Sequence, residues 1–432
     1  MAVRIAIWSC VAICGAGAAF AADWPHWRGP SHDDRSSEPS GWTGSRWPVE
    51  KKWTAEVGEG ASSPIVAKGK LYALGWKDGR DRLVCLDAAN GQEIWAQSYH
   101  APQYGRHSAG DKGLYRGVSA TPALDADAGL LFTVGIDGEL VCWNADDGRE
   151  AWRLNLYDTF RAGQRPDVGG RRGGQGRRDY GYTSSPLVQG ETLIVEAGSP
   201  EGALIALDKR TGKKQWASEA REEAGHSGGP VPIAVEGVPC VAVLALRNLL
   251  VVRTDGANAG KTVATFPWTT DFANNIPTPA VSGHSLIVTS AYNQFAICRV
   301  DVSLNGAKEV WRTKDVASGV CSPIVHDGRI YWAWQGVHCV DFATGKELWH
   351  GGSVGAAGSC ILTADDRLIV WADRGDLLLA ETAKRSPARY TELARLRRIG
   401  DADAWPHVVL ASGRLYCRDR AGRLTCLAIG GE

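Results

Sequence analysis

The sequence predicts an all-β protein, an eight-bladed β-propeller of four-stranded blades. Two alternating patterns predict it. One is a turn that opens with Asp or Asn, closes with Gly and precedes a Trp, as in CLDAANGQEIW, CWNADDGREAW, ALDKRTGKKQW and CVDFATGKELW. The other is a hairpin that begins with small residues and Pro, as in SSPIVAKGKLYA and SSPLVQGETLIV. Each unit therefore contains a hairpin, a third strand, the turn and a fourth strand.

The composition favours many short strands. The 432 residues include 52 Gly, 18 Trp and a single Met, which suits Gly-rich turns between Trp-bearing strands. Lys and Arg (48) balance Asp and Glu (48), so the net charge does not draw the chain as a whole to nucleic acid or to an anionic membrane. Any attraction to an anionic partner has to be local.

Repeat units can be counted along the chain, and the last one is incomplete. The eight units begin near Ser62, Ser119, Ser184, Gly228, Thr278, Ser322, Cys360 and His407. The chain ends with CLAIGGE before any fourth strand, whereas PVEKKWTAEVG near the N-terminus has the alternation of a strand and no hairpin before it. We expect this strand to complete the last blade, because ring closure leaves no open sheet edge. A seven-bladed ring is the alternative if the unit near Ser227 or Cys360 is not a blade.

The repeated turn is interpreted as a packing device. Its Asp or Asn accepts hydrogen bonds from nearby backbone amides, its Gly takes a positive φ, and its Trp packs between neighbouring sheets. The residues assigned to this structural motif are Asp87, Gly91, Trp95, Gly148, Trp152, Asp208, Gly212, Trp216, Trp311, Asp341, Gly345 and Trp349.

The chain divides into three parts. Residues 1–21 have an apolar run and end in an A-x-A site at Ala21, which predicts a cleaved signal peptide. We therefore expect an exported protein, periplasmic or secreted, without a transmembrane anchor. Residues 22–47 form a Trp-rich arm that we expect to dock as a clasp on the propeller at 48–432, because Trp24, Trp27 and Trp42 are costly to expose together.

The cysteines do not suggest a disulfide framework. Eleven are present, and two of them, Cys10 and Cys14, lie within the predicted signal peptide. The remaining nine are an odd number at dispersed spacings. We interpret them as small buried apolar residues.

The motifs ALDKRTGKKQW and VDFATGKELW resemble the PQQ-like β-propeller repeat of quinoprotein dehydrogenases and of the outer-membrane assembly lipoprotein BamB. The N-terminal DWPHWRGP, followed by VGEGASSPIVAKGKLYALG, is similar to exported PQQ-like propeller proteins of planctomycete-type bacteria. The resemblance extends from about residue 23 to 430. It implies the propeller fold and leaves two functions open: a non-catalytic, BamB-like scaffold, and a PQQ-dependent dehydrogenase.

The family's enzymes imply a chemistry that this sequence does not repeat. In them PQQ is stacked between a Trp and a disulfide ring of adjacent cysteines, Ca²⁺ is bound by carboxylate and amide oxygens, and an Asp is the base. This chain has no Cys-Cys pair, no C-x-x-C-H haem site and no segment that matches the ligand or catalytic motifs residue by residue. We therefore expect no catalytic, metal or cofactor-binding residues and no cofactor, with PQQ and Ca²⁺ as the alternative.

Two long interruptions of the repeat, residues 100–117 and 157–182, point to a binding surface. Both join the outer strand of one blade to the inner strand of the next, so both should project from one face beside the central channel. The partner-binding candidates are His107, Arg161, Arg165, Arg171, Arg172, Arg177, Arg178, Tyr180 and Tyr182. We expect a monomer that binds a protein or an anionic envelope or glycan component, and no nucleic acid because the protein is exported. The alternative is a solvated insertion without order.

Replacing four of these arginines by Ala tests the basic loop. The change at Arg171, Arg172, Arg177 and Arg178 should weaken retention on an anionic matrix at low salt, because ionic contacts are lost, and should leave the melting temperature nearly unchanged. Unaltered retention would exclude the loop as an anion-binding element.

Overall fold

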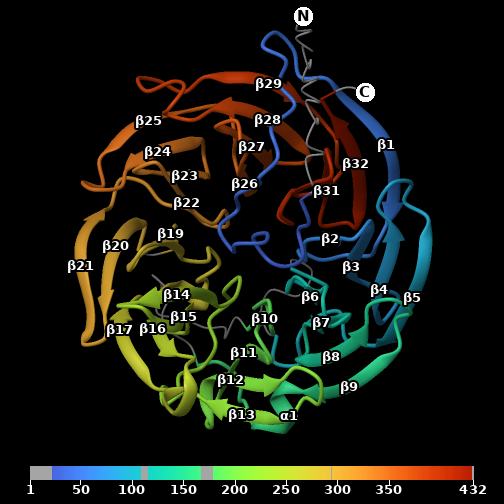
Figure 1. Ribbon diagram of the computed structural model, residues 1–432, viewed down its shortest axis with the longest axis vertical. Coiled ribbons are helices and arrows are strands. Elements are labelled where there is room, and N and C mark those ends of the chain that lie inside the picture. Colours follow the sequence, from blue (N-terminus) through green and yellow to red (C-terminus); the bar gives the residue numbers. More distant parts are fainter. Residues whose placement is uncertain (1–21, 109–114, 167–178, 293, 431–432) are drawn as a thin grey trace, which may run out of the picture.

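The computed structural model describes residues 22–108, 115–166, 179–292 and 294–430. In this part of the chain, 32 strands form eight four-stranded antiparallel sheets around a central axis (Figure 1). The prediction of an eight-bladed propeller is confirmed. The units that begin near Gly228 and Cys360 are blades of their own, so the seven-bladed alternative is wrong.

The first four blades follow one another along the chain, each from its innermost to its outermost strand. Blade 1 contains β2 (Ile65–Ala67), β3 (Lys70–Lys77), β4 (Arg80–Asp87) and β5 (Glu93–His100). Blade 2 contains β6 (Ala123–Asp125), β7 (Leu130–Val134), β8 (Glu139–Asn144) and β9 (Glu150–Asn155), followed by the short helix α1 (Leu156–Phe160). Blade 3 contains β10 (Leu187–Gln189), β11 (Thr192–Ser199), β12 (Gly202–Asp208) and β13 (Lys214–Ala217). Blade 4 contains β14 (Val231–Val235), β15 (Val238–Leu244), β16 (Asn248–Arg253) and β17 (Thr262–Pro267), with the 3₁₀ turns η1 (Gly256–Asn258) and η2 (Asp271–Ala273) before and after β17.

The other four blades continue this order until the ring closes. Blade 5 contains β18 (Ala280–Ser282), β19 (Ser285–Ser290), β20 (Ala296–Ser303) and β21 (Gly306–Thr313). Blade 6 contains β22 (Ile324–His326), β23 (Arg329–Ala333), β24 (Val337–Asp341) and β25 (Glu347–Gly351). Blade 7 contains β26 (Ala357–Leu362), β27 (Arg367–Ala372), β28 (Asp376–Glu381) and β29 (Glu392–Leu396). Blade 8 contains β30 (Val409–Ala411), β31 (Arg414–Arg418), β32 (Arg423–Ile429) and, as its outermost strand, β1 (Val49–Glu56).

The N-terminal strand closes the ring, as the sequence predicts. Strand β1 pairs antiparallel with β32, and Trp53 lies opposite Cys426. A buried cation reinforces the same junction, because Arg418 donates hydrogen bonds to the carbonyl oxygens of Gly58 (2.9 Å), Ser62 (2.6 Å) and Leu74 (2.8 Å). These oxygens belong to the entry of blade 1 and to its second strand. Burial lowers the pKa of Arg418 to about 10, and the three charge-assisted bonds offset part of that desolvation.

The recurring turn and Trp join several neighbouring blades, through Trp53 and Gly91, Trp95 and Gly148, Trp152 and Gly212, and Trp311 and Gly345. Gly148 of blade 2 has a φ of 73°, and a Cβ there would lie 2.6 Å from the indole of Trp95 in blade 1. The glycine is therefore needed both for the turn and for the close approach of the ring. The same contact joins Trp53 to Gly91 across the closure. The turn Asp bonds the backbone, as when Asp208 Oδ1 accepts from the amide of Thr211 at 2.8 Å.

The nine cysteines outside the predicted signal peptide are all buried and all free. Burial raises the pKa of the Cys142 and Cys339 thiols to about 12. Such thiols stay protonated at neutral pH and behave as small apolar groups.

Arg418→Met tests the closure. The substitution leaves the three carbonyl oxygens without their donor, so the free energy of unfolding should fall by about 3 kcal/mol, measured by urea denaturation. Arg414→Met is the matched control, because Arg414 donates to the Ala89 carbonyl oxygen near the surface. Equal losses in the two variants would contradict the role given to Arg418.

Candidate functional site

A cavity of about 110 Å³ lies at the propeller axis, on the face that carries the longer connections. We call this the loop face: it bears the connections from each outermost strand to the next innermost strand and those between the second and third strands of a blade. Most of the cavity lining comes from residues just before the innermost strands, and Tyr292 and Arg420 come from connections between second and third strands. The cavity therefore collects side chains from many blades.

The N-terminal arm closes the cavity from the opposite side. Trp27 lines it, donates from Nε1 to Thr278 Oγ1 (2.9 Å) and lies with its ring centroid 4.1 Å from that of His407. Gly228 makes room for the indole, because a Cβ there would lie 2.8 Å from it. Figure 1 shows the arm, in blue, running into the centre of the ring. Trp27 is thus the floor of the cavity.

A buried ion pair next to Trp27 anchors the arm. Arg28 Nε donates to Asp34 at 2.5 Å, and its two Nη atoms donate to the carbonyl oxygens of Pro279 (3.1 Å) and Pro323 (2.6 Å). Burial by itself would raise the pKa of Asp34, but the Arg28 guanidinium holds it below its usual value. Farther along, the backbone of Trp24 pairs with that of Val66 in β2. The arm is therefore held by several blades, among them blades 1, 5 and 6.

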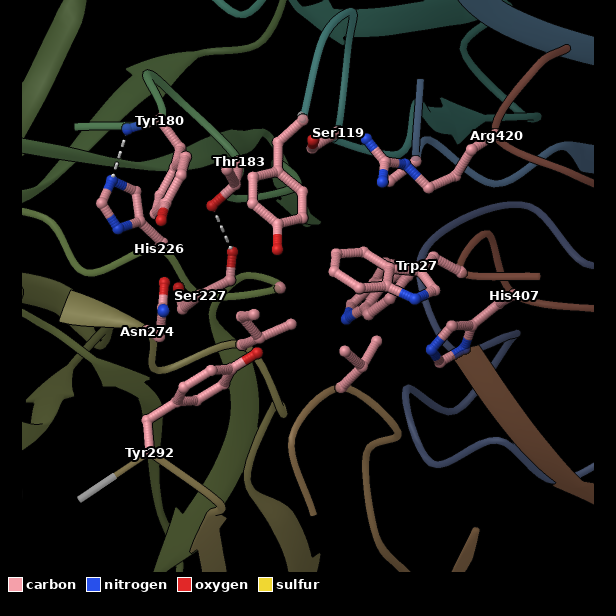
Figure 2. A pocket seen from close by; sticks show the side chains of 16 residues that line it. Trp27, Ser119, Tyr180, Thr183, His226, Ser227, Asn274, Tyr292, His407 and Arg420 are labelled. Atoms are coloured by element: carbon pink, nitrogen blue, oxygen red, sulfur yellow. Dashed lines mark hydrogen bonds between the residues drawn. The ribbon is translucent and has the colours of Figure 1, made fainter. Parts of the chain in front are cut away.

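Aromatic rings form the walls. Tyr115 stacks on Trp405 with 5.3 Å between ring centroids, and it meets Tyr180 edge-on at the same distance. The guanidinium of Arg420 lies over both rings of the stack, 5.1 Å from Tyr115 and 4.9 Å from Trp405. Figure 2 shows Tyr180, Tyr292 and Trp27 directed into the same space from different sides. The lining is therefore mostly apolar, with one cation among the described residues that form it.

His226, on the wall, is held as a neutral imidazole. Its Nε2 accepts from the backbone amide of Tyr180 at 3.0 Å (Figure 2). Nδ1 therefore carries the proton and donates to the Phe272 carbonyl oxygen at 3.0 Å. Burial lowers its pKa, although Asp179 lies 3.7 Å away. With both nitrogens engaged, His226 positions the loop and is not set up as a base.

A second buried group supports the wall from behind. Glu196 in β11 accepts hydrogen bonds from the Gly225 amide (3.0 Å) and from Ser227 Oγ (2.7 Å), and Ser227 lines the cavity. Burial raises the pKa of Glu196 to about 7, against the effect of these donors.

The described partner-binding candidates lie in different environments. Arg165 and Tyr182 are buried, and Arg165 pairs with Asp179 at 2.5 Å, which keeps the pKa of Asp179 well below its usual value despite burial. Arg165 and Tyr182, which the sequence offered as partner-binding candidates, therefore lie inside the protein at the ends of the second loop. Arg161 is exposed at the end of α1, and His107 packs edge-on against Tyr157.

Among the candidates that lie in the described parts of the chain, Tyr180 alone lines the cavity. Residues Arg171, Arg172, Arg177 and Arg178, like the predicted signal peptide, lie outside the described residues. Sequence reasoning missed Trp27 as part of a site, along with Tyr115, Trp405 and Tyr292. The sequence indicated two of these residues. Tyr115 and Trp405 each lie before an innermost strand, in a connection longer than is needed to link two blades.

The described lining does not fit PQQ and Ca²⁺ as the quinoprotein dehydrogenases hold them. It offers Asn274 as an amide and no Asp, Glu or Cys. In the described parts of the chain, no group of three or more His, Cys, Asp or Glu is placed to hold a metal ion. Tyr115 and Trp405 stack on each other, so they leave no slot for a flat ring between them.

The fold defines a PQQ-like β-propeller protein. The family model described as outer membrane protein assembly factor BamB matches residues 79–351. The chain belongs to this family, which confirms the resemblance inferred from the repeat.

Curated relatives match over a shorter part. The chain is 29% identical over 162 residues to the quinohemoprotein alcohol dehydrogenase ADH-IIG of Pseudomonas putida, and 24% identical over 160 residues to ADH IIB of the same organism. Each match covers 36% of this chain and 19% of the relative, so the chain spans about a fifth of the length of these enzymes.

Solved structures show the same fold. BamB from Moraxella catarrhalis is similar with a TM-score of 0.59 at 13% identity, over 88% of this chain and 100% of that one. The quinohemoprotein alcohol dehydrogenase from Comamonas testosteroni gives 0.64 at 13% identity, over 95% of this chain and 81% of that one. Within the described residues, no helix is long and apolar enough to cross a membrane.

Glu196→Gln tests the buried carboxyl behind the wall. In the folded protein Glu196 keeps its proton up to about pH 7, whereas an unfolded Glu loses it near its usual 4.5, so stability should fall as pH rises from about 4.5 to 7. Between pH 5 and pH 8 the wild type should lose about 3 kcal/mol more than the variant in urea denaturation. Glu93→Gln, at an exposed carboxylate, is the control. A variant with the same pH dependence as the wild type would disprove the assignment.

Proposed function

We propose that this protein is an exported, non-catalytic propeller that binds a component of the cell envelope through its loop face. The observation that carries the proposal is the axial cavity, which is closed by Trp27 of the arm on one side and collects residues from the loop-face connections. A cavity with one closed end suits the anchoring of a partner group. Export rests on the signal-like N-terminus, and envelope location is supported by membership of the BamB family.

The walls favour binding over chemistry. His226 has both ring nitrogens engaged, the Ser227 hydroxyl donates to a buried carboxyl group, and the Thr183 hydroxyl donates to the Ser227 carbonyl oxygen at 3.0 Å. A nucleophile needs a base within hydrogen-bond reach, and these groups are arranged as supports for the loops instead. The narrower role, assembly of outer-membrane proteins as named for BamB, is part of the same proposal.

A PQQ-dependent dehydrogenase is the second candidate, because both curated relatives are quinohemoprotein alcohol dehydrogenases. The two functions differ in one measurement. The mature protein is incubated with PQQ and Ca²⁺, and bound-quinone absorbance and alcohol-dependent dye reduction are followed. We expect neither saturable quinone binding nor turnover; both together would replace the scaffold proposal by the dehydrogenase.

Capture of an envelope component tests the binding face. Ser119→Trp places an indole in the cavity, so a component captured from solubilised envelopes by the wild type should be lost. Lys213→Trp, in an exposed turn on the opposite face, is the matched control and should capture normally. Equal capture by both variants would exclude the cavity side of the molecule as the binding face.

A further inference from the structure

The rings around the axial cavity form a cage instead of a slot. Tyr115 and Tyr180 are nearly perpendicular, at 87°, and Tyr180 and His226 are at 71°. The two near-parallel rings, Tyr115 and Trp405 at 22°, are stacked on each other. A flat polycyclic ligand needs two parallel plates with a gap between them, and this cavity offers ring faces and edges in several directions. Its shape suits a ligand of about one ring with apolar groups on more than one side.

Hydroxyl and amide groups and one guanidinium are among the polar groups of the cage. Ser119 contributes a hydroxyl group, Asn274 a carboxamide, and Tyr292 a phenol that points into the cavity (Figure 2). Burial raises the pKa of the Tyr292 phenol to about 12, so it stays protonated and can both donate and accept. Arg420 lies at the stacked pair, with Asp403 3.7 Å from it. Donors and acceptors for hydroxyl groups thus surround the Arg420 guanidinium, which is paired with Asp403.

A sugar acid matches this combination. A pyranose ring exposes C–H groups on its faces, which pack on aromatic rings, and hydroxyl groups at its edge, which need neutral partners. A uronic acid adds one carboxylate, which an Arg binds well. The cavity volume of about 110 Å³ is of the order of one such ring, and the closed floor at Trp27 stops a chain from threading through.

We propose that the axial cavity binds the terminal uronic acid residue of an acidic glycan, with Arg420 on its carboxylate and Trp405 and Trp27 against its ring. The inference rests on the proposed function and names the ligand class of that same face. The rest of the glycan leaves the cavity across the loop face.

The test uses the mature protein and immobilised glycans of defined structure. Each glycan ending in glucuronic or galacturonic acid is paired with the neutral counterpart ending in glucose or galactose. We expect binding to one uronate-terminated series, about tenfold stronger than to its neutral pair. Titration with the soluble form of the best glycan should shift the Trp fluorescence, because Trp27 and Trp405 line the site.

Variants separate the two contacts. Arg420→Gln should remove most of the preference for uronate and keep the weak binding of the neutral glycan, whereas Trp405→Ala should weaken both by about tenfold. Arg420→Lys and Trp405→Phe should retain part of the binding. These conservative variants replace Arg420→Gln and Trp405→Ala in the measurement if the latter unfold the protein. Arg414→Gln, outside the cavity, is the control and should bind like the wild type.

Three results would overturn the inference. The first is that no glycan binds, and the second is that neutral and uronate-terminated glycans bind equally. The third is that PQQ displaces the bound glycan, as followed by Trp fluorescence, and binds with higher affinity. The first two leave the proposed function standing if an envelope component is still captured and Ser119→Trp abolishes the capture. Quinone-dependent turnover is the result that removes both.

Discussion

Closure of the ring is the constraint on which the rest of the structure depends. Eight sheets share one axis only if the last sheet meets the first, and the chain achieves this by pairing β1 with β32 across almost its whole length. Arg418 adds a buried cation at this junction, bonded to three carbonyl oxygens of blade 1 and the segment before it. Closure removes the open edges of a linear array and fixes the positions of the connections that meet at the axis.

The N-terminal arm has two physical roles that follow from one position. Its Arg28, paired with Asp34, donates hydrogen bonds to carbonyl oxygens at the entries of blades 5 and 6, which ties distant parts of the ring together. The same arrangement sets Trp27 at the floor of the cavity. A clasp that is also a cavity floor links the stability of the arm to the shape of the site, so the arm belongs to the site as much as to the scaffold.

The two long loops contribute through their ends. Tyr115 from the first and Tyr180 from the second meet at 5.3 Å beside the axis. At the two ends of the second loop, Arg165 and Asp179 form a buried ion pair. Nε2 of His226 accepts a hydrogen bond from the backbone amide of Tyr180. Charges that looked like a partner surface in the sequence therefore serve in part to hold an aromatic wall in place. Burial makes the difference: a buried Arg needs a partner such as Asp179, whereas an Arg on the surface would present its positive charge to solvent or to a partner.

The sequence by itself determined the propeller class, the closing strand and the packing role of the turn, because these depend on a repeated local pattern in which Gly and Trp occupy fixed positions. It favoured eight blades over seven, and the sheet pairing decided between them. It also indicated which connections are long. Only the tertiary structure decided the site. Trp27, Tyr180 and Trp405 are far apart in the chain and come together because a closed ring brings the connections of different blades to one axis. Likewise, the repeat pattern carries no information on whether Arg165 faces solvent or Asp179, since that choice depends on contacts between separate segments.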